Sequence, residues 1–297
     1  MPDHHVTFGF EAEFSNNVDR LTAYLADAGL SRARNMHAYH CDCDCCDFED
    51  GGVFRSQRDS TCGGEVISQV FDSTPGGWVE AREAMQGLEN AALVADAEPG
   101  MSAGFHVHVE APRSYDVRVQ MLWEFVRWES PLSFLGQGRW ASMRRQNQSL
   151  CGLYGEDLAM DPEELYDTHH LADRHSNLNL HTNHGTVEFR LWNSTRAAWR
   201  MGLFAGLSVA FTDPAFLERL MTRSVSRSNF VHAVHSYDPA LGLMAAAQYD
   251  YRSRHARAAQ GVPLTATVST ALPEDNDPTW HDGSVIQPID HDLFAVG

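Results

Sequence analysis

Hydrophobic and polar residues alternate in six segments of the chain, which is typical of strands with one buried and one polar face. The segments are Val6–Phe14, Phe54–Ser60, Gly64–Phe71, Ala103–Glu110, Asn177–His181 and Thr186–Trp192. Turn residues, Thr182-Asn183-His184-Gly185, join the last two segments, so we expect these to form a hairpin.

Apolar residues recur at spacings of three and four in other segments, which predicts helices with one buried stripe. These helices are expected from Val18 to Ala28, from Pro75 to about Ala92, from Tyr115 to Trp128, from Thr195 to Thr212, over Pro214–Thr222 and from Pro239 to Ala258. Thr74 and Pro75 are a typical helix start, Gly29 a typical stop, and Pro131 is expected to end the third helix.

Strands scattered among helices and joined by hairpin-like links predict an α+β fold with a largely antiparallel sheet. We expect a main domain over residues 1–222, with a cysteine-rich loop inserted at 37–52. Residues 223–259 are expected to be a helical extension of the same domain. Residues 260–297, rich in proline and acidic residues, are expected to be an irregular tail.

Composition excludes several chemistries. All 22 basic residues are arginine, so a Schiff-base lysine, a P-loop and a protein-kinase site are excluded. The charge balance of 22 − 40 = −18 argues against a nucleic-acid partner. The N-terminus lacks the pattern of a signal peptide, and the longest uncharged apolar stretch, Met201–Thr212, is about half of a membrane span. We therefore expect no membrane partner and a cytoplasmic location.

Polar residues that carry chemistry occur at spacing two within the predicted strands. They are Glu11 and Glu13, His106 and His108, Glu188 and Arg190, with Glu65 on a further strand. Residues i and i+2 of a strand share a face, so each pair points the same way. Taken singly, each pair also fits an ordinary solvated strand face. Together, so many carboxylates would repel one another unless cations lay between them.

Carboxylates with one or two imidazoles suit Mg²⁺ or Mn²⁺. An arginine beside such a site suits a phosphoryl group, because its planar fork binds charged oxygens. The residues alone therefore predict a divalent-metal, phosphate-handling site on an antiparallel sheet.

These segments resemble the glutamine synthetase-like superfamily of carboxylate–amine ligases, and within it the amidoligase family. The matching pieces are Phe8–Phe14, Gly64–Ser68, Gly104–His108, Asp173–Asn179 and Thr186–Leu191, in family order. The resemblance implies that residues 1–222 are a glutamine synthetase-like catalytic domain, in which a curved antiparallel sheet forms an active-site cup backed by helices.

The resemblance also implies roles for individual residues. Glu13 and Glu65 would bind a metal near the acid substrate. Glu11, His106 and Glu188 would bind the metal on the phosphates of ATP. His108 and Arg174 would contact nucleotide or phosphate, and Arg190 would also stabilise the phosphoryl group in transfer. A further glutamate that glutamine synthetase brings to its first metal has no match in this chain.

Asp59 lies six residues before Glu65. The related Pup-ligase branch has an aspartate at a similar spacing that acts as a base, so the resemblance implies that Asp59 accepts the proton of the incoming amine. The alternative is an ordinary turn aspartate before a strand.

A cysteine-rich loop lies just before Asp59. Cys41, Cys43, Cys45 and Cys46 occur within six residues, and His37, His40 or Cys62 could complete a tetrahedral zinc site. The alternatives are reduced, solvated thiols, or thiols buried as small apolar groups. Cys62 as a nucleophile is a further hypothesis, although no neighbouring base is evident.

The function expected from this resemblance is ATP-dependent formation of an amide or isopeptide bond through an acyl phosphate, with Mg²⁺ or Mn²⁺. The partners would be a carboxylate substrate and an amine acceptor: an amino acid, a peptide or a protein. Three alternatives stay open: a phosphotransferase of the guanidino-kinase type, hydrolysis by the same site, and a non-catalytic metal-binding protein.

Overall fold

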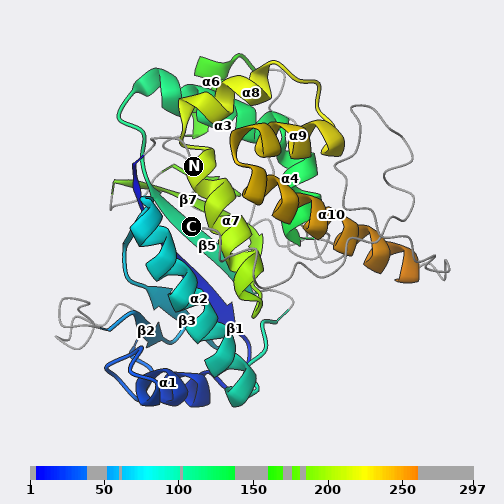
Figure 1. Ribbon diagram of the computed structural model, residues 1–297. Coiled ribbons are helices and arrows are strands. Elements are labelled where there is room, and N and C mark those ends of the chain that lie inside the picture. Colours follow the sequence, from blue (N-terminus) through cyan, green and yellow to red (C-terminus); the bar gives the residue numbers. More distant parts are fainter. Residues whose placement is uncertain are drawn as a thin grey trace.

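A computed structural model describes residues 5–38, 52–59, 62–100, 103–137, 160–169, 176–180 and 185–259. Within this part of the chain, seven strands form one sheet, in which the spatial order of the strands differs from their order in the sequence (Figure 1). They are β1 (Thr7–Phe14), β2 (Phe54–Gln57), β3 (Gly64–Ser68), β4 (Phe71–Asp72), β5 (Gly104–Glu110), β6 (Leu178–Asn179) and β7 (Thr186–Asn193). The order is β2-β3-β1-β5-β7-β6, β4 also pairs with β1, and these pairings are antiparallel.

Helices surround one face of this sheet, so the fold is α+β, with a curved antiparallel sheet backed by helices. The described helices are α1 (Val18–Asp27), α2 (Pro75–Ala95), α3 (Tyr115–Arg127), α4 (Glu129–Gln137), α6 (Pro162–His169), α7 (Ala198–Ala210), α8 (Pro214–Met221), α9 (Arg227–Tyr237) and α10 (Pro239–Ala259). In Figure 1, α2 and α7 lie across the sheet, α8 and α9 lie above α7, and α10 lies to its right. None of the described helices has the length and apolar character needed to cross a membrane.

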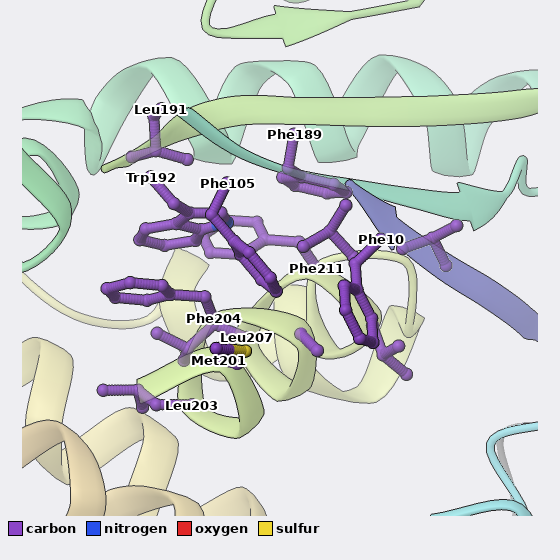
Figure 2. Packing of buried hydrophobic residues seen from close by; sticks show 14 of the residues in the cluster. Phe10, Phe105, Phe189, Leu191, Trp192, Met201, Leu203, Phe204, Leu207 and Phe211 are labelled. Carbon is purple, nitrogen blue, oxygen red and sulfur yellow. The ribbon is translucent and has the colours of Figure 1, made fainter. Parts of the chain in front are cut away.

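The core lies between the sheet and these helices. The pleat directs every second residue of β1, β5 and β7, mostly phenylalanine and valine, into it. Figure 2 shows Phe105 and Trp192 of the sheet meeting Phe204 of α7, and the ring of Phe189 contacts that of Phe211. The rings of Trp192 and Phe204 stack with their centroids 4.8 Å apart. Burial of each such side chain contributes roughly 2–3 kcal/mol. This burial holds the apolar face of the sheet against the helices, so the charged residues lie on the opposite face.

The C-terminal helices belong to the same apolar cluster. Phe230 of α9 and Tyr249 of α10 are buried in it. Helix α10 also binds the C-terminal half of α4: Gln248 Nε2 donates to the carbonyl of Leu135 (3.0 Å), and Arg252 donates to that of Gly136 (3.2 Å). These bonds satisfy carbonyls that a helix leaves open at its end. Residues 223–259 therefore pack on the sheet domain through α4, α7 and α8.

The predicted strands and helices match the structure in position, with informative differences. The segment Gly64–Phe71 is broken into β3 and β4, and the hydroxyl of Ser68 accepts a hydrogen bond from Phe10 N (2.9 Å) at the break. Pro131 does not end the helical region, because it lies in the first turn of α4, where its missing N–H has no partner to lose. Helices α4 and α6 were not predicted, and α9 lies in the stretch 223–259 that was expected to be helical, although its bounds were not predicted.

Thr195 was predicted to cap α7, but the residue at the cap position is Ala197. The helix begins at Ala198, and the Thr195 hydroxyl instead accepts a hydrogen bond from Ala197 N (3.2 Å) in the turn before it. The expected irregular tail, residues 260–297, lies outside the described residues.

Candidate functional site

The polar face of the sheet brings together charged residues from distant parts of the chain. Alternation places them opposite the apolar core on β1, β3, β5 and β7. The strand register then sets their neighbours: Glu11 is paired with His106, Glu13 with Glu65, and His108 with Glu188. The predicted residues Glu11, Glu13, Glu65, His106, His108, Glu188 and Arg190 therefore share one face.

One part of this face, here called the histidine end, comprises Glu11, His106, His108, Glu188 and Arg190. His106 Nδ1 lies 3.4 Å from a carboxylate oxygen of Glu11 and 3.4 Å from Glu188 Oε1. His108 Nε2 lies 3.5 Å from Glu11 Oε1 and 3.9 Å from Glu188 Oε1. A guanidinium nitrogen of Arg190 donates to the same Glu188 oxygen (2.5 Å). Two carboxylates thus face two imidazoles and one guanidinium.

Charge compensation at the histidine end sets the pKa values. Burial alone would raise the pKa of Glu11, but the neighbouring imidazoles of His106 and His108 outweigh it and hold that pKa well below 4.5. The pKa of Glu188 is likewise lowered, because His106, Arg190 and His108 together outweigh its burial. The pKa of His108 is raised despite burial, since Glu11 and Glu188 favour the imidazolium. Both carboxylates are therefore ionised at neutral pH.

Ligand atoms of Glu11, His108 and Glu188 lie within 4.8 Å of one another, which is compatible with a shared metal ion. The Nδ1 atom of His108 lies 3.4 Å from the hydroxyl of Thr186, and its buried Nε2 makes no hydrogen bond of ordinary geometry with a described residue. A histidine bound through one nitrogen typically has the other oriented by such a partner. About a quarter of the Glu11 and His108 side chains is exposed, so an ion can reach the group.

The imidazole of His106 lies between the histidine end and the neighbouring carboxylates. Its Nε2 lies 3.5 Å from Glu13 Oε1, while its Nδ1 faces Glu11 and Glu188. The side chain is only 4% exposed, and Nε2 has no hydrogen bond of ordinary geometry with a described residue. His106 therefore touches both groups of carboxylates on this face.

The second part of the face, here called the carboxylate end, comprises Glu13, Glu65 and Asp59. Glu13 accepts a hydrogen bond from Gly104 N (2.5 Å), and Glu65 accepts one from the amide of Gln57. Burial raises the pKa of Glu65 to about 8, and the charges of Glu11, Asp59 and Glu13 add to this effect, while the Gln57 hydrogen bond opposes it. The imidazole of His106 reaches Glu13, yet the pKa of Glu65 stays raised, so a bound cation would relieve the repulsion on Glu65.

Asp59 lies at the same end, after β2, and is partly buried. Its charge contributes to the raised pKa values of both Glu65 and Cys62, which places the carboxylate near them. The Cys62 thiol donates to the carbonyl of Gly64 (3.4 Å), and burial together with the charges of Glu13 and Asp59 raises its pKa strongly. A thiol in this environment stays protonated at neutral pH, which argues against Cys62 as a nucleophile.

Several predicted site residues lie outside the described residues, namely Arg174 and the four cysteines Cys41, Cys43, Cys45 and Cys46. The backbone just before the cysteine-rich loop is described: His37 N donates to Ser56 O, and Arg58 N donates to His37 O, each at 2.9 Å. This pairing brings the start of the loop to the strand that carries Gln57 and leads to Asp59.

Three polar residues of the site were not singled out from the sequence: Gln57, Asn179 and Thr186. Gln57 contacts Glu65, Asn179 contacts Glu188, and Thr186 lies against His108. Each occupies a strand position on the polar face, so alternation could have placed it there. Only the register shows which carboxylate or imidazole it meets.

Neither models of known protein families nor curated proteins match this chain. The fold and the residues of the polar face are therefore the basis on which a function can be proposed.

Proposed function

We propose that this protein is an ATP-dependent carboxylate–amine ligase with a glutamine synthetase-like sheet, working with Mg²⁺ or Mn²⁺. The observation that carries the proposal is the meeting of Glu11, Glu65, His106 and Glu188 on one face, although they come from strands far apart in the sequence. The antiparallel sheet backed by helices supports the same proposal, because it presents these groups as a cup-like ligase site would require.

The residues fit divalent cations. The buried Nε2 of His108 and the oxygens of Glu11 and Glu188 are suitable donors for one ion, with His106 beside them. At the carboxylate end, Glu13 and Glu65 are suitable donors for a second. When bound, such ions would offset the charge of the ATP phosphates and polarise the phosphoryl group.

In the proposed reaction, a substrate carboxylate attacks the γ-phosphorus of ATP, giving an acyl phosphate and ADP. An amine then attacks the acyl carbon, the C–O bond to phosphate breaks, and an amide and phosphate are released. Arg190 would place its guanidinium on the phosphoryl oxygens during transfer. Asp59 would accept the proton that the ammonium loses before attack. His108 and Arg174 remain candidates for contacts with the nucleotide.

The test is to incubate the purified protein with ATP, Mg²⁺ and pooled carboxylic acids, amino acids and peptides, and to measure ADP and new amide masses. Hydroxylamine should trap the acyl phosphate as a hydroxamate. Glu13→Gln should abolish both products. Glu110→Gln is the control and should not, because Glu110 lies on the polar face of β5 but accepts a hydrogen bond from Thr7. No substrate-dependent ADP across a broad panel, or full activity of Glu13→Gln, would contradict the proposal.

The same assay separates the alternatives. A stable phosphorylated product without an amide would indicate a phosphotransferase, and release of an amine from an amide would indicate hydrolysis. If calorimetry with ATP and Mg²⁺ shows no binding, a non-catalytic metal-binding role is favoured instead.

A further inference from the structure

Asn179 lies beside the histidine end, on the short strand β6. It is paired with Glu188 in the β6–β7 register, and its amide Nδ2 donates a hydrogen bond of 2.8 Å to Glu188 Oε2. Each of the two residues is only 5% exposed. The contact is therefore a buried amide–carboxylate bond across two strands, which holds both side chains in one orientation.

The two oxygens of Glu188 have different surroundings. Oε2 accepts the hydrogen bond from Asn179, whereas Oε1 faces His106 Nδ1 at 3.4 Å and accepts from Arg190. Because the bond to Oε2 fixes the carboxylate plane, it also fixes the direction of Oε1. The hydrogen bond from Asn179 to Oε2 therefore helps to set which oxygen of Glu188 faces His106 and Arg190.

We propose that Asn179 is a positioning residue, whose amide binds Oε2 of Glu188 and thereby turns Oε1 toward Glu11 and His108. The inference rests on the proposed function, since it concerns how the chain prepares its cation-binding group. Partners of metal ligands at this distance typically contribute about 10–100-fold to metal affinity. Removing the amide should therefore weaken cation binding without removing a ligand.

The chain supplies a matched control two residues earlier. The amide of Asn177 donates a hydrogen bond of the same length, 2.8 Å, to Glu129 Oε1, and both partners are buried. Glu129 begins α4 and is not part of the histidine end. Asn177→Leu thus breaks the same kind of bond, with a similar expected cost in stability, at a carboxylate that has no role in the site.

The experiment measures free Mn²⁺ by electron paramagnetic resonance during titration of wild type, Asn179→Leu and Asn177→Leu, with near-ultraviolet circular dichroism to verify folding. Asn179→Leu is expected to weaken Mn²⁺ binding by about 10-fold or more, and Asn177→Leu to leave it within about twofold. Equal affinities of the two variants would overturn the inference while leaving the proposed function intact. Absence of Mn²⁺ binding by wild type would overturn both.

A double-mutant cycle tests whether Asn179 acts through Glu188. In a Glu188→Gln background, Asn179→Leu should cause no further loss of Mn²⁺ affinity, and a fully additive loss would contradict the inference. If Asn179→Leu does not fold, Asn179→Ser takes its place, because its hydroxyl is one bond shorter than the amide and so withdraws the donor from Glu188 Oε2 while keeping a polar side chain. An unchanged Mn²⁺ affinity in that variant would overturn the inference, and a loss of about threefold or more would support it.

Discussion

The histidine end and the carboxylate end lie on the same sheet face but differ in how their charge is balanced. At the histidine end, two imidazoles and Arg190 surround two carboxylates, and the pKa values of Glu11 and Glu188 are lowered. At the carboxylate end, Gly104 donates a hydrogen bond to Glu13 and Gln57 donates one to Glu65. These bonds do not offset burial and the neighbouring negative charges, and the pKa of Glu65 rises to about 8.

This difference shows how one sheet can carry two kinds of acidic group. Cations of the chain itself stabilise the ionised carboxylates at the histidine end, so a metal ion must compete with Arg190 and with the proton on His108 there. At the carboxylate end, the raised pKa of Glu65 indicates an excess of negative charge around it, which a proton or an added cation would relieve. Substitutions at the two ends should therefore have opposite effects on stability and similar effects on activity.

The largest effect is expected from Glu188→Gln at the histidine end. The variant removes a negative charge from the group formed with Glu11 and His108, and leaves Arg190 without its carboxylate partner. We expect ATP turnover to fall by roughly 10³-fold, since loss of one preorganised charged group typically costs that much. Steady-state ADP release measures it, with Glu110→Gln as control, and wild-type turnover would contradict the proposed site.

Arg190→Met should separate binding from chemistry at the same end. The guanidinium lies on Glu188 Oε1, so its removal should free that oxygen and strengthen Mn²⁺ binding modestly. It should also lower kcat by about 100-fold, because the phosphoryl oxygens lose a charge partner. Mn²⁺ titration and kcat measurements on the same preparation test both parts. Weaker Mn²⁺ binding together with unchanged kcat would show that Arg190 has only a structural role.

At the carboxylate end, Glu65→Gln should stabilise the metal-free protein. The amide keeps the hydrogen-bonding shape but carries no charge, so repulsion from Glu11, Asp59 and Glu13 is lost. We expect the metal-free variant to be more stable than wild type at pH 8 by about 1–3 kcal/mol, the usual cost of a poorly compensated buried group. Urea denaturation with EDTA measures it. A less stable variant would contradict a surplus of negative charge.

The smallest effect is the pH dependence of the metal-free protein. The folded pKa of Glu65, about 8, lies above its ordinary 4.5, so unfolding releases a proton through this window and stability falls as pH rises. His108, with a pKa raised above 6.5, stabilises the fold below that pH and loses this contribution at higher pH. The free energy of unfolding should drop by about 1–2 kcal/mol from pH 5 to pH 8.

A matched measurement sharpens this test. Glu65→Gln should flatten the pH profile between pH 5 and pH 8, whereas Glu110→Gln should leave it unchanged. Added Mg²⁺ should stabilise the wild type most at pH 8, where protons compete least. Stability that rises with pH in the metal-free wild type would contradict the charge surplus at the carboxylate end.

Much of the fold could be predicted because its signals are local. Alternation in Thr7–Phe14 and Gly104–Glu110 marked both strands and assigned Glu11 and His106 to polar faces. Capping by Thr74, whose hydroxyl accepts from Gly77 N (3.3 Å), marked the start of α2. The bounds of α9 were not predicted, because its apolar residues are spread around the helix, which is buried on several sides by its neighbours.

The sequence by itself determined which side chains share a face, because a strand repeats every two residues whatever surrounds it. The tertiary structure decided which of them meet. The register opposes Glu13 to Glu65 and His108 to Glu188, and a bulge after Phe105 shifts the pairing of β5 with β7. Register depends on contacts between distant segments, and so do the bonds of Gln57 and Asn179 and the burial that moves each pKa. Local pattern carries no information about those distances.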